Sequence, residues 1–190
     1  MSTAEVRPNQ RDHILDTALR LMSERGAVGM SMRQLASACD LQVAAIYHYF
    51  DSKDALLAAV VAERQYGTRM ADPLPVDPSA SAEERLHEVF RFVFTGALEE
   101  QSIWRLVLGE GMRGEETVVP VGRELLELLF PAARSWIEQA VPEIRDPEAV
   151  ARLLVGQMLA GFVRHVFRPD EDPEVIARES SGPLVALALG

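Results

Sequence analysis

Hydrogen-bonding side chains and two cations gather in one short stretch of the sequence, between residues 31 and 53. They are Ser31, Arg33, Gln42, Tyr47, His48 and Lys53. Hydroxyl, imidazole and ammonium groups donate to phosphate oxygens, and arginine paired with guanine is the commonest specific contact to a DNA base. Three small residues, Val43, Ala44 and Ala45, lie among them and can approach a groove closely enough to touch thymine methyl groups. This chemistry is non-covalent recognition of a nucleic acid.

The residue types divide these roles. Arg33 is the candidate base reader, whereas Ser31, Tyr47, His48 and Lys53 are candidates for fixing register on phosphates. Lys53 falls in the first turn of a predicted helix, where free backbone N–H groups already favour an anion. The alternative stays open, because a surface arginine or lysine is usually only solvated.

Apolar spacing predicts two short helices at a tight turn, which would position these side chains. Ser31 and Gln34 form a capping box, and Met32, Leu35, Ala36 and Cys39 follow on one face. Asp40 falls at the turn, where it tolerates left-handed backbone. A second helix starts near Gln42 with Ile46 and Phe50 inward, and a third opens at Ser52. This is the pattern of a helix-turn-helix, whose second helix enters the major groove. An ordinary helix pair in an all-α core is the alternative.

Several spaced motifs over the first third of the chain resemble the DNA-binding domain of tetracycline-repressor (TetR) family regulators. They are S-M-R-x-L-A at 31–36, A-I-Y-x-Y-F at 45–50, S-K-D-x-L-L at 52–57, and the preceding helix at 14–26. Two positions depart from the family pattern: Asp40 stands where glycine is usual, and Gln42 where a serine or threonine cap is frequent. The resemblance implies a homodimer that binds a palindromic operator in double-stranded DNA, with the last two helices (about 147–189) forming a four-helix dimer interface.

Composition is consistent with a globular, cytoplasmic protein. The 190 residues suffice for one or two small domains, and the single cysteine excludes an internal disulfide. The N-terminal residues have no charged-then-apolar signal pattern. Neither a cofactor nor a metal is expected, because His87 and His165 have no further histidine or cysteine at ligand spacing.

The net charge of −10 runs against nucleic-acid binding. Most of it lies late in the chain: residues 1–66 carry seven Lys and Arg against eight Asp and Glu, and residues 67–190 carry twelve against twenty-one. Local geometry must therefore place cations against phosphates, and the affinity should be modest and salt-sensitive.

The remaining pattern predicts an all-α chain in two domains. Residues 1–70 form the helix-turn-helix domain, with a flexible arm at 1–8 and a fourth helix that reaches about Met70. Three prolines mark a linker at 71–80, and residues 81–190 form a helical effector-binding and dimerisation domain. Ser81 and Glu84 cap a strongly amphipathic helix. Another helix begins near Pro120, and Pro131 should kink or split it.

Gly109 to Gly114 reads GEGMRG and matches the dinucleotide-binding pattern G-x-G-x-x-G. That fold needs a strand before the motif, a helix directly after it and further parallel strands, which this sequence lacks. The glycines are expected instead to loosen a connection between two helices.

Residues 147–167 carry almost no polar face, which predicts a helix buried on all sides. Arg152, Gln157 and Arg164 interrupt it, so it is not expected to span a membrane. One side can pack on its own core and the other on a second copy, and Gly156 and Ala160 would admit a close partner helix. The alternative is the central core helix of a monomer.

By analogy with the family's variable effector domain, residues 81–190 would hold an unidentified small apolar ligand. Its candidate residues are Phe90, Phe94, Trp104, Met158 and Phe162, with Gln157 or His165 as a polar anchor. Plain core is the alternative for such a stripe. Three functions stay open: a ligand-responsive dimeric repressor is favoured, a ligand-binding dimer without DNA binding is the alternative, and an enzyme lacks any catalytic set.

Overall fold

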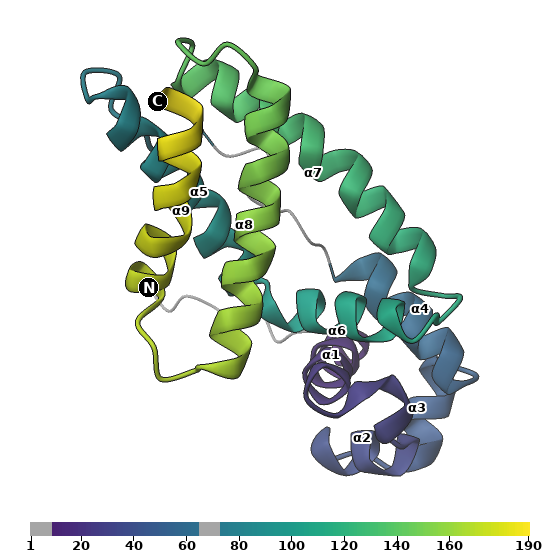
Figure 1. The fold of residues 1–190 in the computed structure, drawn as a ribbon. Coiled ribbons are helices and arrows are strands. Elements are labelled where there is room, and N and C mark those ends of the chain that lie inside the picture. The colour runs from purple at the N-terminus through teal and green to yellow at the C-terminus, as the bar shows by residue number, and fades with distance from the viewer. Residues whose placement is uncertain (1–8, 65–72) are drawn as a thin grey trace, which may run out of the picture. The chain divides into compact units, whose positions relative to one another are not determined.

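The protein is described from a computed structural model that covers residues 9–64 and 73–190 (Figure 1). The described residues contain nine helices and no strand, which confirms the all-α prediction. The helices are α1 (Gln10–Gly29), α2 (Met32–Ala38), α3 (Val43–Tyr49), α4 (Lys53–Glu63), α5 (Ala82–Glu99), α6 (Gln101–Met112), α7 (Val119–Ala140), α8 (Pro147–Phe167) and α9 (Pro173–Leu189). They form two compact units. Of the described residues, the first unit combines 9–64 with 101–124, and the second combines 73–100 with 125–190.

The core of the first unit lies between α1, α4 and α6, with α2 and α3 at its side. Ile14, Leu35, Ile46 and Val60 are fully buried there. Cys39 closes α2 on its inner face, where burial raises the pKa of its thiol. It behaves as a small core residue, because a raised pKa keeps the thiol protonated and unreactive.

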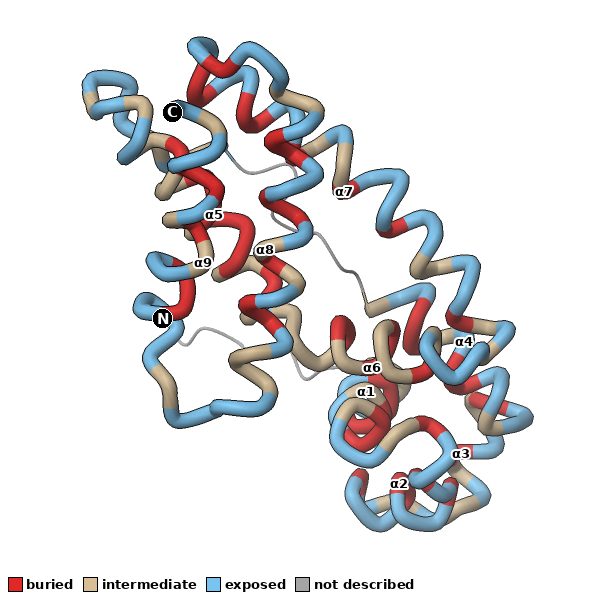
Figure 2. The backbone as a smooth tube through the Cα atoms, viewed as in Figure 1, coloured by how far each residue is buried: buried red, intermediate tan, exposed pale blue. Residues whose placement is uncertain are grey.

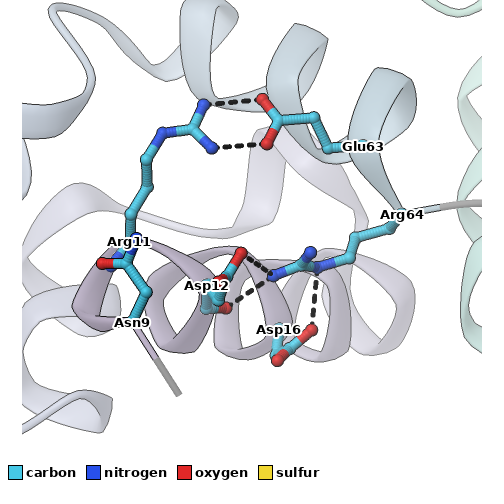
Figure 3. Close-up of polar contacts among 6 residues, drawn as sticks. All are labelled: Asn9, Arg11, Asp12, Asp16, Glu63 and Arg64. Carbon is cyan, nitrogen blue, oxygen red and sulfur yellow. Dashed lines mark hydrogen bonds and ion pairs between the residues drawn. The ribbon is translucent and has the colours of Figure 1, made fainter.

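Two arginines tie the start of α1 to the end of α4 (Figure 3). Arg11 pairs with Glu63 through both guanidinium nitrogens, and Arg64 donates to the Asp12 carbonyl at 2.7 Å and pairs with Asp16 at 2.8 Å. Arg11 holds the pKa of Glu63 below its usual range. This pair therefore stabilises the fold above the ordinary pH range of glutamate titration, and the contribution is lost as the pH falls through the lowered pKa.

Arg64→Ala is expected to lower the free energy of unfolding by about 1 kcal/mol, because the part-buried Asp12 carbonyl loses its donor and two carboxylates lose their ion-pair partner. Its side chain is 20% exposed, which reduces but does not cancel this contribution. Arg20→Ala is the matched control: its pair with Glu24 spans 3.5 Å on an exposed helix face. Urea unfolding should place this control within about 0.5 kcal/mol of the unchanged protein. Equal losses in the two variants would contradict the assigned role of Arg64.

In the second unit, α9 packs on both α5 and α8. Ser81 caps α5 through the expected capping box with Glu84, and the buried face of α5 carries Phe90 and Phe94. At Gly161, α8 lies close to both α5 and α9, because a Cβ there would lie 3.1 Å from the Phe94 ring and 3.2 Å from Ser180 Oγ. In the last turn of α8, Arg164 pairs with Glu171 and Glu179 and so fixes the turn into α9.

Several expectations about individual helices need correction. α7 continues through Pro131 as one helix, so the proline does not split it. Gly109 and Gly111 lie inside α6, and only Gly114 of the GEGMRG motif, with φ of 78°, stands in a turn. The buried apolar face of α6 keeps the helix continuous through Gly109 and Gly111.

Helix α8 is buried on the side that packs on its own core, as expected, and its other side, which was expected to pack on a second copy, is exposed in the single chain. Figure 2 shows buried and exposed positions alternating along it. By length and composition α8 is the one helix of the described ranges that could cross a membrane, although its inner face packs on α5 and α9 within this unit.

The domain limits at 70 and 81 stay predictions. Residues 101–124 belong to the same compact unit as the helix-turn-helix, so this unit includes a segment that the sequence assigned to the second domain. The expected arm at 1–8, the end of helix four beyond Arg64, and the start of the linker at 71–72 lie outside the described residues.

Candidate nucleic-acid interface

The turn between α2 and α3 is built by its backbone. Asp40 takes a left-handed conformation with φ of 55°, and the amides of Asp40 and Leu41 donate back to the carbonyls of Ser37 and Ala36. This pair of bonds is a Schellman motif, which satisfies the last carbonyls of α2 and ends the helix. Glycine adopts this conformation at less cost than aspartate, yet the turn forms in the expected place.

Helix α3 is anchored on its inner side and open on its outer side. Ile46 is fully buried and Phe50 is 4% exposed, so both act as the predicted anchors. Ala44, Tyr47 and His48 are exposed, at a spacing that puts them on one helical face. Val43 and Ala45 flank this face and are half-buried. The exposed face of α3 is therefore small and polar, as a helix that enters a groove requires.

The other predicted DNA-contacting side chains lie on the segments next to α3. Arg33 and Gln42 are exposed, and Gln42 makes no side-chain cap to α3. Ser31 is partly engaged, because its hydroxyl accepts from the Gln34 amide at 3.2 Å. Lys53 donates from Nζ to the Val28 carbonyl at 3.0 Å, which orients the ammonium and leaves two of its three N–H groups for an anion.

Tyr49 and Arg11 have roles that differ from a reading of the sequence alone. Tyr49 donates to Gln10 at 3.1 Å and lies edge-on to His48, with ring centroids 5.3 Å apart, so it braces the exposed imidazole. Arg11 is a cation at the start of α1, but Glu63 holds its guanidinium, which lies 5.2 Å from the centroid of the Phe50 ring. The spacing of residues in the sequence does not reveal contacts between such distant positions.

The candidate ligand-binding residues of the second unit are mostly core. Phe90, Phe94, Met158 and Phe162 are all at most 2% exposed, and the two rings on α5 stack with centroids 6.1 Å apart. Gln157 and His165 are half-buried, and His165 Nδ1 has no hydrogen-bond partner among the described residues. Trp104 belongs to the first unit. A hollow of about 550 Å³ in the second unit is lined by other residues, among them Leu74, Val76 and Ala140.

The outer side of α8 presents an apolar stripe. Leu153, Val163 and Phe167 are 41%, 48% and 81% exposed, and Gly156 and Ala160 lie between them. The intervals of three and four residues are those of a helix that packs along a second helix. A Cβ at Gly156 would meet no atom of this chain within 4 Å.

The described residues combine a helix-turn-helix, whose second helix has an exposed outer face, with a second helical unit. Residues 14–60 match the family described as "Bacterial regulatory proteins, tetR family". The match covers about a quarter of the chain and confirms, for this segment, the resemblance that the sequence motifs indicated.

Curated relatives are regulators as well. The chain is 32% identical over 98 residues to an uncharacterized HTH-type transcriptional regulator of Xanthobacter autotrophicus, covering 50% of this chain and 48% of that protein. It is 26% identical over 178 residues to the HTH-type transcriptional repressor KstR of Rhodococcus jostii, covering 93% and 82% respectively. The chain thus spans about half the length of the first of these relatives and most of the second.

Solved structures share the whole fold. AibR, determined in complex with isovaleryl coenzyme A and operator DNA, is 26% identical, with a TM-score of 0.63 over 93% of this chain and 98% of that one. A TetR-like transcriptional regulator from Rhodococcus sp. RHA1 is 24% identical, with a TM-score of 0.69 over 97% and 98%.

Proposed function

We propose that this protein is a cytoplasmic transcriptional repressor that binds a palindromic operator as a homodimer and is released by a small-molecule effector. The observation that carries the proposal is the exposed face of α3, small and polar on an anchored helix, with Arg33 and Lys53 beside it. The family match over residues 14–60 and the operator complex of AibR support the DNA-binding part.

Each predicted contact takes a role in this proposal. Arg33 reads a guanine, and the small residues 43–45 touch thymine methyls. Ser31, Gln42, Tyr47, His48 and Lys53 bind phosphates and set the register. Lys53 is the strongest of these, because the Val28 carbonyl orients its ammonium at the first turn of α4, where the helix dipole also favours an anion.

The homodimer would form through α8 and α9. The apolar stripe on α8 supports this, since an apolar row from Leu153 to Phe167 would be covered by the same row of a second copy. Two recognition helices in such a dimer read half-sites about one turn of DNA apart.

The first experiment is a mobility shift and footprint on the DNA upstream of the protein's own gene, at low and moderate salt. A palindromic footprint is expected, with an affinity that falls steeply as salt rises. Lys53→Ala and Tyr47→Ala should each weaken binding by about tenfold, with the Lys53 variant also showing a smaller salt dependence.

If no shift is seen, either the operator lies elsewhere in the genome or the protein does not bind DNA, and selection from random DNA distinguishes these two cases. A sequence selected there would place the operator elsewhere in the genome. A second blank at micromolar dimer would reject the repressor and favour a ligand-binding dimer without DNA binding, the function that the acidic second half of the chain would suit.

The effector class proposed for first testing is a short acyl thioester. AibR, which is 26% identical over nearly the full chain, was determined with isovaleryl coenzyme A. The unpaired Nδ1 of the half-buried His165 is the candidate polar contact. Titration with isovaleryl coenzyme A should weaken operator binding by about 5- to 150-fold, the usual range of allosteric coupling. Free coenzyme A is the control, and equal effects of both would reject the acyl chain as the recognised group.

A further inference from the structure

Glu110 of α6 is buried without an obvious reason in the sequence. It is 2% exposed, and within the described ranges it is the one charged side chain buried to this degree. Removing a carboxylate from water costs several kcal/mol unless hydrogen bonds replace the lost hydration. The bonds that Glu110 makes therefore indicate what it is for.

The main partner of Glu110 is a backbone amide of α1. Ala27 N donates to Glu110 Oε1 at 2.6 Å, although the two residues are 83 positions apart. Arg113 Nη1 donates to the same oxygen at 3.0 Å from a side chain that is 62% exposed. A charged acceptor on a buried backbone amide is among the stronger hydrogen bonds in proteins.

The amide is available because α1 is broken one residue earlier. Gly26 takes φ of 76° and ψ of 155°, which are not helical values. A Cβ at Gly26 would lie 3.2 Å from Glu110 Oε1 and in a conformation that side chains rarely adopt. Glycine and glutamate thus form one docking point between α1 and α6.

The docking point leads directly to the helix-turn-helix. Val28, next to Ala27, accepts from Lys53 of α4, and Met30 is 1% exposed. Ser31 then caps α2. The connector at 27–30 is consequently held by α6 through Glu110 and by α4 through Lys53, and it sets where α2 begins.

Helix α6 directly follows the second unit along the chain. A single residue, Glu100, separates it from the end of α5. After α6, the first residues of α7 belong to the first unit, and the same helix continues into the second unit from Leu125.

We propose that Glu110 is a positioning residue that fixes the helix-turn-helix on α6 through the Ala27 amide and thereby sets operator affinity. The effect on operator affinity rests on the proposed function, whereas the fixing of the connector does not. A shift of α6 that breaks the Glu110 contact releases the connector, so that α3 is no longer held in its binding position.

The test compares Glu110→Ala with Glu110→Gln in the full chain. Alanine leaves the Ala27 amide buried without its acceptor, whereas the glutamine amide oxygen can still accept from it. Operator affinity should fall about tenfold in Glu110→Ala and stay within about threefold in Glu110→Gln. Amide hydrogen exchange, followed by mass spectrometry over residues 27–38, should accelerate in the alanine variant alone.

Glu116→Ala is the matched control, because it removes one negative charge from an exposed position shortly after α6. It should leave exchange unchanged and operator affinity equal or slightly higher. A merely structural role would lower the melting temperature of Glu110→Ala while operator affinity at 25 °C stayed unchanged, which would overturn the proposal.

Glutamine behaving as alanine would also overturn it. If the protein without substitutions binds no DNA, the proposed function is rejected. Hydrogen exchange in the two Glu110 variants then still decides whether Glu110 fixes the connector. If the alanine variant does not fold, a folded glutamine variant with faster exchange at 27–38 would reject the role of the acceptor oxygen.

Discussion

Ala44→Glu is expected to abolish specific operator binding, with a loss of affinity of at least about a hundredfold. Ala44 is exposed on the outer face of α3, one turn before Tyr47 and His48. A carboxylate there would face base edges and phosphates in the groove, where like charges repel and no donor replaces its hydration. The affinity is measured by fluorescence anisotropy on the footprinted operator.

Ala62→Glu separates a local effect from a general effect of charge. This alanine is exposed on α4, in the same unit, and the substitution adds the same charge. Its affinity should stay within about threefold of the unchanged protein, since exposed charges beyond a Debye length are largely screened. Melting temperatures of both variants should be close to that of the unchanged protein. Equal losses of affinity at the two sites would mean that α3 does not enter the groove.

Substitution by leucine is expected to destabilise the fold at one glycine of α8 and to weaken the dimer at another. Gly161→Leu should lower the free energy of unfolding by about 3 kcal/mol, because overpacking forces neighbours from their positions. Phe94, Ser180 and Ile176 all lie within 3.4 Å of where its Cβ would be. Chemical denaturation measures this loss.

Gly156→Leu changes the same residue type on the same helix, but its Cβ would meet open space. The fold of each chain should survive. If the stripe on α8 is the dimer contact, the added side chain obstructs the close approach of a second α8, and sedimentation should show a dissociation constant raised by at least about tenfold. A dimer as tight as the unchanged protein would move the interface elsewhere.

The sequence was sufficient to predict the helix-turn-helix because its signals are local. Ser31 and Gln34 form their capping box within one turn, and Ile46 and Phe50 are buried as their spacing requires. The turn at Asp40 also formed where expected, since the backbone bonds to Ser37 and Ala36 do not depend on a glycine.

The sequence was less informative where the outcome depends on distant residues. The bond from Ala27 to Glu110 joins segments 83 positions apart, and a glutamate at the end of an apolar run carries no sign of it. The pairing of Arg11 with Glu63 was missed for the same reason. An apolar helix such as α8 has the same sequence pattern whether its outer side meets its own core or another chain, so the pattern alone did not decide between a core helix of a monomer and a dimer contact.

The rate at which Cys39 is chemically modified can report the opening of the helix-turn-helix. It is the single cysteine of the sequence and 6% exposed, and burial raises the pKa of its thiol. A thiol-specific reagent can therefore modify the chain at one position, and only when α2 opens away from α1. The rate of that modification reports how often the recognition element comes apart, and operator DNA should slow it in proportion to the fraction of protein bound.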